Sequence, residues 1–172
     1  MPELPEVEIL KKSLNKNIKS AKITKIKINN RNLRYKVPVN LNTVLTGQII
    51  KNISRVAKYL ILHFSFGEKL LIHLGMSGTI HLIKEKNKTN TNASFYYSSD
   101  LPIKHNHIEI KLNNTLKLIY NDPRRFGYFK LLPKNFIHES PLNNLGPEPF
   151  STSFNLFYIK KFIKNEKTNV KN

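Results

Sequence analysis

The sequence predicts a mainly β domain of the α+β class, in which a β-sandwich or a barrel-like sheet packs against an N-terminal helix. Two observations predict it. Apolar residues recur at helical spacing at the start of the chain, and further on they alternate with polar residues in short runs separated by turn residues. With 172 residues the chain is long enough to bury one core and too short for two ordinary domains.

The first expected element is a helix initiated by Pro5, because proline is favoured in the first helical turn. Val7, Leu10, Leu14 and Ile18 then follow at spacings of three and four and form one apolar stripe. We expect this stripe to anchor the N-terminal end of the chain on the core.

Beyond the helix the apolar spacing changes to two, which predicts short strands. The alternating apolar residues are Ile26 and Ile28; Leu60 and Leu62; Leu70 and Ile72; Ile108, Ile110 and Leu112; Leu116, Leu118 and Tyr120. Asn113-Asn114 lies between two of these runs, so residues 107–112 and 115–120 are expected to form a hairpin. Several short strands of this kind favour a sandwich or a barrel.

The remaining segments set the domain organisation. Residues 84–106 are polar and without period, and we expect a mobile surface loop and an insertion there. The residues 146–149, Gly-Pro-Glu-Pro, indicate a linker between a domain at 1–149 and a segment at 150–172. That segment predicts a strongly apolar helix with Ser153 as its cap. Since such a helix needs partners on several sides, we infer a truncated gene product, a fragment or half of a split protein.

The charge balance favours a nucleic acid as partner without establishing one. Lys and Arg number 29 against 11 acidic residues, a net charge of +18 that attracts phosphate. Abundant Lys, Asn and Ile also indicate codon bias from an AT-rich genome, which is a competing cause of the basicity. Arginine is scarce, and two of the five arginines are adjacent, at Arg124-Arg125.

Composition also excludes several classes of protein. Without cysteine, the chain has neither disulfides nor thiolate zinc sites. No apolar run approaches the ~18 residues of a membrane span, and acids replace the basic start of a secretion signal. We expect a cytoplasmic protein with no membrane partner, associated with the nucleoid when bound to DNA.

The N-terminus carries a candidate nucleophile. Removal of Met1 leaves Pro2 with a secondary α-amine, which titrates near pH ~8 and is partly unprotonated at neutral pH. Attack of this amine on an aldehyde-type carbon forms an iminium, a cationic electron sink, and the neighbouring Glu3 can shuttle protons. The alternative is that Met-Pro is simply a common chain start and that Pro5 only begins a helix.

Four strings follow the opening Met1-Pro2-Glu3-Leu4-Pro5-Glu6-Val7-Glu8: Ala57-Lys58-Tyr59-Leu60, Ile72-His73-Leu74-Gly75-Met76-Ser77-Gly78, Asp122-Pro123-Arg124-Arg125-Phe126-Gly127 and Leu145-Gly146-Pro147-Glu148-Pro149. Together they resemble, in the same order, the formamidopyrimidine-DNA glycosylase family, bifunctional enzymes that remove oxidised purines and cleave the abasic site. The resemblance implies a catalytic two-layer antiparallel β-sandwich at 1–149 and the first helix of a helix-two-turn-helix domain after it. In family members the structural zinc finger lies in the C-terminal part of the protein, which has no counterpart in this chain, so the resemblance implies no cofactor here.

The resemblance also implies catalytic roles. Pro2 would attack C1′ of the damaged nucleotide, Glu3 would protonate the sugar ring oxygen, and Lys58 would sit against the lesion sugar and phosphate and support β-elimination. Glu6 would orient the N-terminus, or it is only a first-turn acid favoured by the helix dipole. Leu4 matches the branch of the family that acts on oxidised purines.

Further positions would contact DNA. His73 matches a phosphate contact, with a core-edge histidine as the alternative. Met76, Arg124 and Phe126 match the triad that is wedged into the duplex when the damaged base leaves the stack, where an apolar wedge and a guanidinium offset the cost of extrusion. Two further DNA-contacting positions match His105 and Lys167. Arg125, next to the triad, is expected to pair with an acid or a phosphate.

Three functions follow for this chain. The first is base-excision repair of damaged double-stranded DNA, with glycosylase and lyase activity, by a monomer or together with a separate C-terminal half. The second is a catalytically weak or inactive DNA-binding remnant, because the resemblance assigns the phosphate clamps and the loop over the lesion to the C-terminal half. The third is a basic RNA-associated β-domain.

Overall fold

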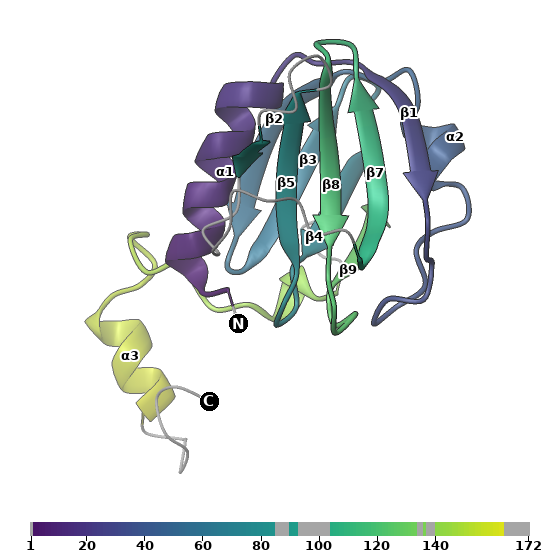
Figure 1. Ribbon diagram of the computed structural model, residues 1–172. Helices are drawn as coiled ribbons and strands as arrows, with labels where there is room; N and C mark the ends of the chain where they lie inside the picture. Colours follow the sequence, from purple (N-terminus) through teal and green to yellow (C-terminus); the bar gives the residue numbers. More distant parts are fainter. Residues whose placement is uncertain (1, 85–89, 93–103, 134–135, 137–139, 164–172) are drawn as a thin grey trace.

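The strands form two antiparallel sheets stacked face to face, so the sequence-based prediction of a sandwich is confirmed (Figure 1). The computed structural model describes residues 2–84, 90–92, 104–133, 136 and 140–163. One sheet has the strand order β1-β7-β8-β5-β6 and the other β2-β3-β4-β9. The elements are α1 Leu4–Ile18, β1 Ile23–Ile28, α2 Leu41–Leu45, β2 Ile50–Val56, β3 Tyr59–Phe64, β4 Lys69–His73, β5 Thr79–Lys84, β6 Asn90–Asn92, β7 Asn106–Leu112, β8 Leu116–Asn121, β9 Tyr128–Leu132, the short 3-10 helix η2 Leu142–Asn144 and α3 Leu156–Ile163.

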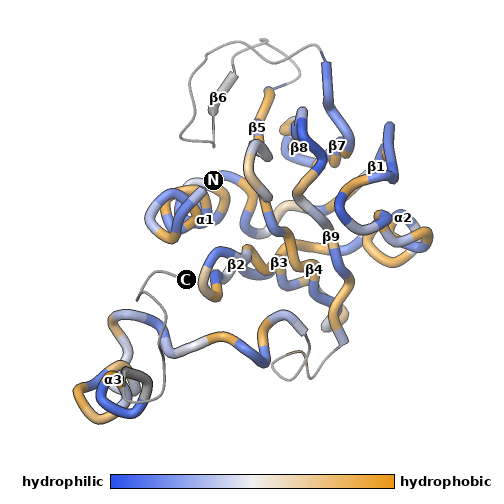
Figure 2. The backbone as a smooth tube through the Cα atoms, turned by 90° about the horizontal axis from the view of Figure 1, so that it is seen from below, coloured by the Kyte–Doolittle hydropathy of each residue, from blue (hydrophilic) through white to orange (hydrophobic). Residues whose placement is uncertain are grey.

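Helix α1 lies along one edge of the sandwich and α2 along the other (Figure 2). The predicted apolar stripe of α1 is confirmed, because Val7, Leu10, Leu14 and Ile18 are all buried. They join the inward-facing residues of both sheets in one core. The N-terminal end of the chain is therefore fixed to the sandwich by the hydrophobic effect.

The predicted hairpin is also confirmed, since β7 pairs with β8 in antiparallel register. The alternation expected for the other strands fails in β3 and β4, where Ile61 and Leu71 are 0 % exposed although they point away from the main core. A second cluster on that outer face contains Tyr128, Leu132 and Leu142. The chain around Leu142 covers this face, so both faces of the sheet are apolar.

Two local expectations are corrected. Residues 90–92, inside the segment expected to be a loop, form β6 and pair with β5, because the edge of β5 offers unpaired backbone groups. The cap of α3 is Asn155 and not Ser153, since the Asn155 side chain accepts the Tyr158 N–H at 3.0 Å. Helix α3 stands apart from the two layers, and Phe157 on it is 80 % exposed (Figure 2).

Three connections between strands and the start of α1 lie at one end of the sandwich. Tyr59 at the start of β3 pairs with His73 at the end of β4, which in turn pairs with Tyr128 at the start of β9. Thr79 at the start of β5 pairs with Asn121 at the end of β8. The β2–β3 turn, the β4–β5 loop, the β8–β9 loop and the start of α1 therefore meet at this end (Figure 1).

Candidate functional site

Lys58 lies in the two-residue turn between β2 and β3. Ala57, the first turn residue, has φ 47°, as required at that position of a tight hairpin turn. Glu148 accepts the Ala57 N–H at 2.6 Å and binds the Arg55 guanidinium through both carboxylate oxygens, at 3.0 and 2.7 Å. Arg55 also donates to the Ala57 carbonyl and, at 2.8 Å, to Glu8 of α1. Glu148 thus holds the turn directly, and Arg55 connects the turn to Glu8 of α1.

These ion pairs lower the pKa of both carboxyl groups, Glu148 and Glu8. Hydrogen bonds from Arg55 lower the pKa of Glu148. Burial raises the pKa of Glu8, but its bonds to Lys11 and Arg55 outweigh burial and the net pKa is lowered. Both carboxylates therefore stay charged at neutral pH and keep Arg55 in place.

The start of α1 meets this turn. The Lys58 ammonium lies 2.7 Å from Glu3 Oε2, and Glu3 directly follows Pro2, which is buried. Glu6 accepts the Glu3 N–H at 2.9 Å, as in a capping box, so it is more than a solvated first-turn acid. The structure thus places Pro2 and Glu3, at the start of α1, beside Lys58 of the turn, and we call these three residues the N-terminal corner.

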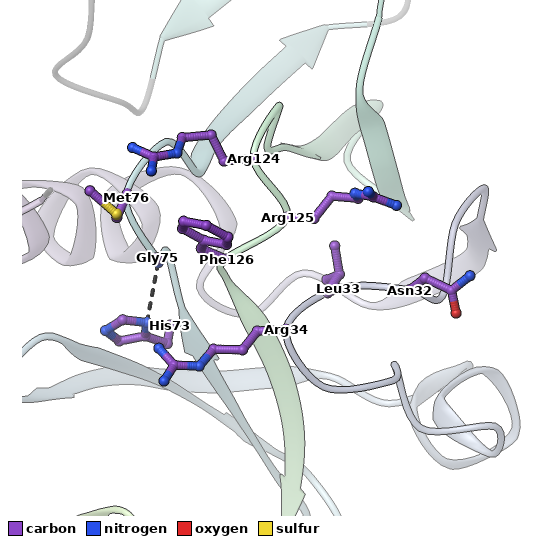
Figure 3. Close-up of a pocket in the computed structure, with 9 residues that line it drawn as sticks. All are labelled: Asn32, Leu33, Arg34, His73, Gly75, Met76, Arg124, Arg125 and Phe126. Carbon is purple, nitrogen blue, oxygen red and sulfur yellow. Dashed lines mark hydrogen bonds between the residues drawn. The ribbon is translucent and has the colours of Figure 1, made fainter.

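His73, at the end of β4, has one ring nitrogen committed within the protein. Its Nδ1 accepts the Gly75 N–H at 3.1 Å (Figure 3). Burial lowers the His73 pKa, and the charges of Arg34 and Lys58 lower it further. The ring is therefore neutral at pH 7 with its proton on Nε2, which leaves an N–H donor for a ligand.

Met76 comes from the β4–β5 loop, and Arg124 and Phe126 come from the β8–β9 loop, so the fold brings the predicted triad together (Figure 3). Met76 is 45 % and Phe126 is 42 % exposed, large values for apolar side chains in a folded domain. The Arg124 guanidinium lies over the Phe126 ring, 4.7 Å from its centroid. We call Met76, Arg124 and Phe126 the wedge.

A hollow of about 680 Å³ joins the wedge to His73. Asn32 and Arg34, from the loop between β1 and α2, line it as well, and sequence reasoning missed both. Arg34 is one of only five arginines in a lysine-rich chain, which was the available signal. Arg125 points away from the wedge in Figure 3 and forms no ion pair with the acids in the described part of the chain.

The other two predicted DNA contacts lie outside this cluster. His105 is exposed just before β7, at φ 67°, and its carbonyl accepts the Asp122 N–H at 3.1 Å. Lys167 lies outside the described residues. Among the described residues, no group of three or more His, Asp or Glu side chains is arranged to hold a metal ion, and no helix is long and apolar enough to cross a membrane.

Comparison with known proteins identifies the family to which the chain belongs. Residues 1–129 match the family model described as the formamidopyrimidine-DNA glycosylase N-terminal domain. The chain belongs to this family. Since the model matched is that of the N-terminal domain and the chain has no cysteine, the family's zinc finger is not part of it.

Curated relatives are bacterial proteins of the same name. Formamidopyrimidine-DNA glycosylase of Legionella pneumophila strain Lens is 38 % identical over 171 residues, and that of Wolbachia pipientis is 37 % identical over 175. A solved complex of the Lactococcus lactis enzyme with DNA containing an abasic site superposes with a TM-score of 0.82 at 29 % identity. The alignments cover 99 % of this chain but only 57 % of the Legionella protein and 59 % of the Lactococcus chain.

Proposed function

We propose that this chain is the nucleophile-bearing catalytic part, residues 1–149 with the segment at 150–172, of a DNA glycosylase that acts on oxidised purines in double-stranded DNA. The observation that carries the proposal is the convergence of the N-terminal corner, the Nε2 donor of His73 and the wedge at one end of the sandwich. A lone proline start or a lone arginine pair would not support it.

In this proposal the chemistry runs through the chain's own groups. The unprotonated Pro2 amine attacks C1′, the bond from C1′ to the damaged base breaks, and the base departs with a proton. Glu3 protonates the sugar ring oxygen, which opens the ring and leaves an iminium. Glu3, which is then a carboxylate, takes the C2′ proton, and the 3′ phosphate leaves by β-elimination. Loss of the C4′ proton expels the 5′ phosphate in a second elimination, and water hydrolyses the iminium and restores the Pro2 amine.

Lys58 is suited to support these eliminations because its ammonium already lies against Glu3, at 2.7 Å. When a DNA phosphate arrives, Lys58 can exchange the Glu3 carboxylate for the phosphate. That exchange withdraws the Lys58 ammonium from the Glu3 carboxylate, which then takes part in proton transfer, while His73 contributes a neutral hydrogen bond to the DNA backbone. The proposal therefore assigns the ion pair to the free protein and its opening to the complex.

A second candidate is DNA binding without cleavage. It is favoured by the share of the relatives that this chain does not cover, because the chain spans 57 % of the Legionella protein. Catalysis needs C1′ held at near-attack distance from the amine, and phosphate contacts supplied from elsewhere would contribute to that placement. For the isolated chain this candidate predicts phosphate-dominated binding with a steep salt dependence.

Borohydride trapping separates the two candidates. The chain, with removal of Met1 verified by mass spectrometry, is incubated with duplexes carrying an abasic site or 8-oxoguanine opposite cytosine. We expect a covalent adduct on the abasic duplex that disappears in Pro2→Leu, because a bulky second residue keeps Met1 and blocks the amine. Pro5→Ala is the matched control, since it alters the same helix start and leaves the amine free.

The outcomes are distinct. An adduct on 8-oxoguanine supports base excision, and an adduct on the abasic duplex alone supports lyase chemistry. An adduct that persists in Pro2→Leu contradicts the assignment of the nucleophile. Binding with no adduct from the verified N-terminus favours the second candidate.

A further inference from the structure

The Asp122 carboxylate is an unusual buried group. The residue is 0 % exposed, and in the described part of the chain no cation pairs with it. Three donors surround it: Ser77 Oγ reaches Oδ1 at 2.5 Å, while the Tyr120 hydroxyl at 3.0 Å and the Gly127 N–H at 2.9 Å reach Oδ2. Burying a carboxylate is costly, and these hydrogen bonds offset that cost.

Two of the three donors belong to the two loops that carry the wedge, and Tyr120 comes from β8. Ser77 lies in the β4–β5 loop next to Met76, and Gly127 ends the β8–β9 loop directly after Phe126. Ser77 Oγ also accepts the Arg124 N–H at 3.2 Å. A continuous hydrogen-bond path therefore runs from the Arg124 backbone through Ser77 to the carboxylate.

The same two loops touch backbone to backbone. A Cβ on Gly75 would lie 2.4 Å from the nitrogen of Gly127 and from the carbonyl carbon of Phe126. A Cβ on Gly127 would lie 1.8 Å from the Tyr120 hydroxyl. Because no side chain fits there, the loops can approach closely enough for one carboxylate to bind both.

Tyr120, in β8, supplies the third donor to the carboxylate. Burial raises the pKa of Tyr120, and the negative charge of Asp122 raises it further. The hydroxyl therefore keeps its proton throughout the physiological pH range and remains a donor to the carboxylate. The Asp122 site is thus fully satisfied before any ligand arrives.

We propose that Asp122 is a positioning residue that preassembles the wedge by tying the Met76 loop to the loop of Arg124 and Phe126. This inference rests on the proposed function, because it assigns the wedge to a DNA duplex. Buried ionised groups are weak evidence for stability and are better explained where they specify one geometry. If the side chains of the wedge are already ordered in the free protein, their insertion into the duplex does not lose that conformational entropy on binding.

The test uses a DNA duplex that carries 2-aminopurine next to an abasic-site analogue. Insertion of the wedge unstacks the 2-aminopurine, and the fluorescence of this base rises. Ser77→Ala and Asp122→Asn break the tie, and Phe126→Ala is the reference for a missing wedge. Ser65→Ala is the matched control, because Ser65 Oγ also accepts a backbone N–H from another segment, Ile49 at 3.2 Å, at the opposite end of the sheet.

At saturating protein and low salt, we expect the loop variants to bind DNA nearly as well as the wild type, because phosphate contacts dominate affinity. The fluorescence gain with Ser77→Ala and Asp122→Asn should fall about tenfold, towards that of Phe126→Ala. This is the loss expected when one or two side chains of the wedge are no longer ordered before they insert. Ser65→Ala should give the full gain. Thermal unfolding identifies any variant that has not folded, and Ser77→Ala decides if Asp122→Asn does not fold.

A full fluorescence gain in the folded Ser77→Ala variant overturns the inference and leaves the proposed function intact. A loss of gain that only follows a loss of affinity overturns it as well. Absence of DNA binding by the wild type overturns the proposed function itself, and the inference with it.

Discussion

The N-terminal corner and the wedge lie at the same end of the sandwich, but interactions of different strength hold them in place. At the corner the Glu3 and Lys58 side chains are 52 % and 33 % exposed, so their ion pair is screened by water and weak. Behind the wedge, the Asp122 carboxylate is fully buried and bound by three donors. The difference suits their proposed tasks: a corner that exchanges partners during catalysis needs weak contacts, whereas a wedge that displaces a base needs a fixed shape.

The largest effect is expected at the corner. Lys58→Ala should slow strand cleavage of the abasic duplex, followed on denaturing gels, on the order of 100-fold, because the acid–base catalysis that the proposal couples to Lys58 contributes at least that much. The melting temperature should barely change, since an exposed ion pair contributes little to stability. The control is Lys51→Ala, an exposed lysine of β2. Equal rates of strand cleavage by both variants would contradict the role of Lys58 in the eliminations.

A smaller and more selective effect is expected at the wedge. In the proposal Arg124 hydrogen-bonds the base that is left without its partner. We therefore expect the wild type to bind cytosine and adenine opposite an abasic site differently, and Arg124→Ala to lower that difference about tenfold, within the range for one guanidinium contact to a base. Arg125→Ala, the adjacent arginine that points away, should weaken binding to all duplexes alike and reduce the salt slope by about 1. Salt titrations by fluorescence anisotropy, with cytosine or adenine opposite the site, distinguish the two. A change of base preference in Arg125→Ala would contradict the assignment.

The smallest effect is expected at His73, which lies between the two regions. Because burial and the nearby Arg34 and Lys58 lower its pKa, the folded state favours the neutral ring more than the unfolded chain does. Its contribution to stability is therefore present above the unfolded pKa of about 6.5 and is lost as the pH falls through the lower folded pKa. Urea midpoints at pH 7.5 and 5.5 should differ more for the wild type than for His73→Gln.

His63 has a lowered pKa for the same first reason, burial, so His73→Gln should keep part of the pH dependence. The exposed His105 serves as the control, and His105→Gln should behave like the wild type. A His73→Gln variant that loses as much stability on acidification as the wild type would contradict the assignment.

The local elements were readable from the sequence because each follows a short-range rule. The stripe from Val7 to Ile18 predicted α1, and the alternation around Asn113-Asn114 predicted the β7–β8 hairpin. Ser153 was a plausible cap of α3, but Asn155 is the residue whose side chain reaches the Tyr158 N–H. Buried Ile61 and Leu71 broke the alternation because a distant segment around Leu142 covers the outer face, which no local pattern reveals.

For the candidate site, the sequence by itself determined which residues were proposed: Pro2 with the amine that it can provide, the neighbouring Glu3, and the strings that contain Lys58, His73 and the wedge. Only the tertiary structure decided their partners. Glu3 and Lys58, Ser77 and Asp122, and Arg55 and Glu148 are 55, 45 and 93 positions apart, yet each pair is bonded. Their encounters depend on strand register and loop packing. Strand register and loop packing are set by burial summed over the whole core. The sequence pattern therefore indicates which chemical groups are present but not how they are arranged in space.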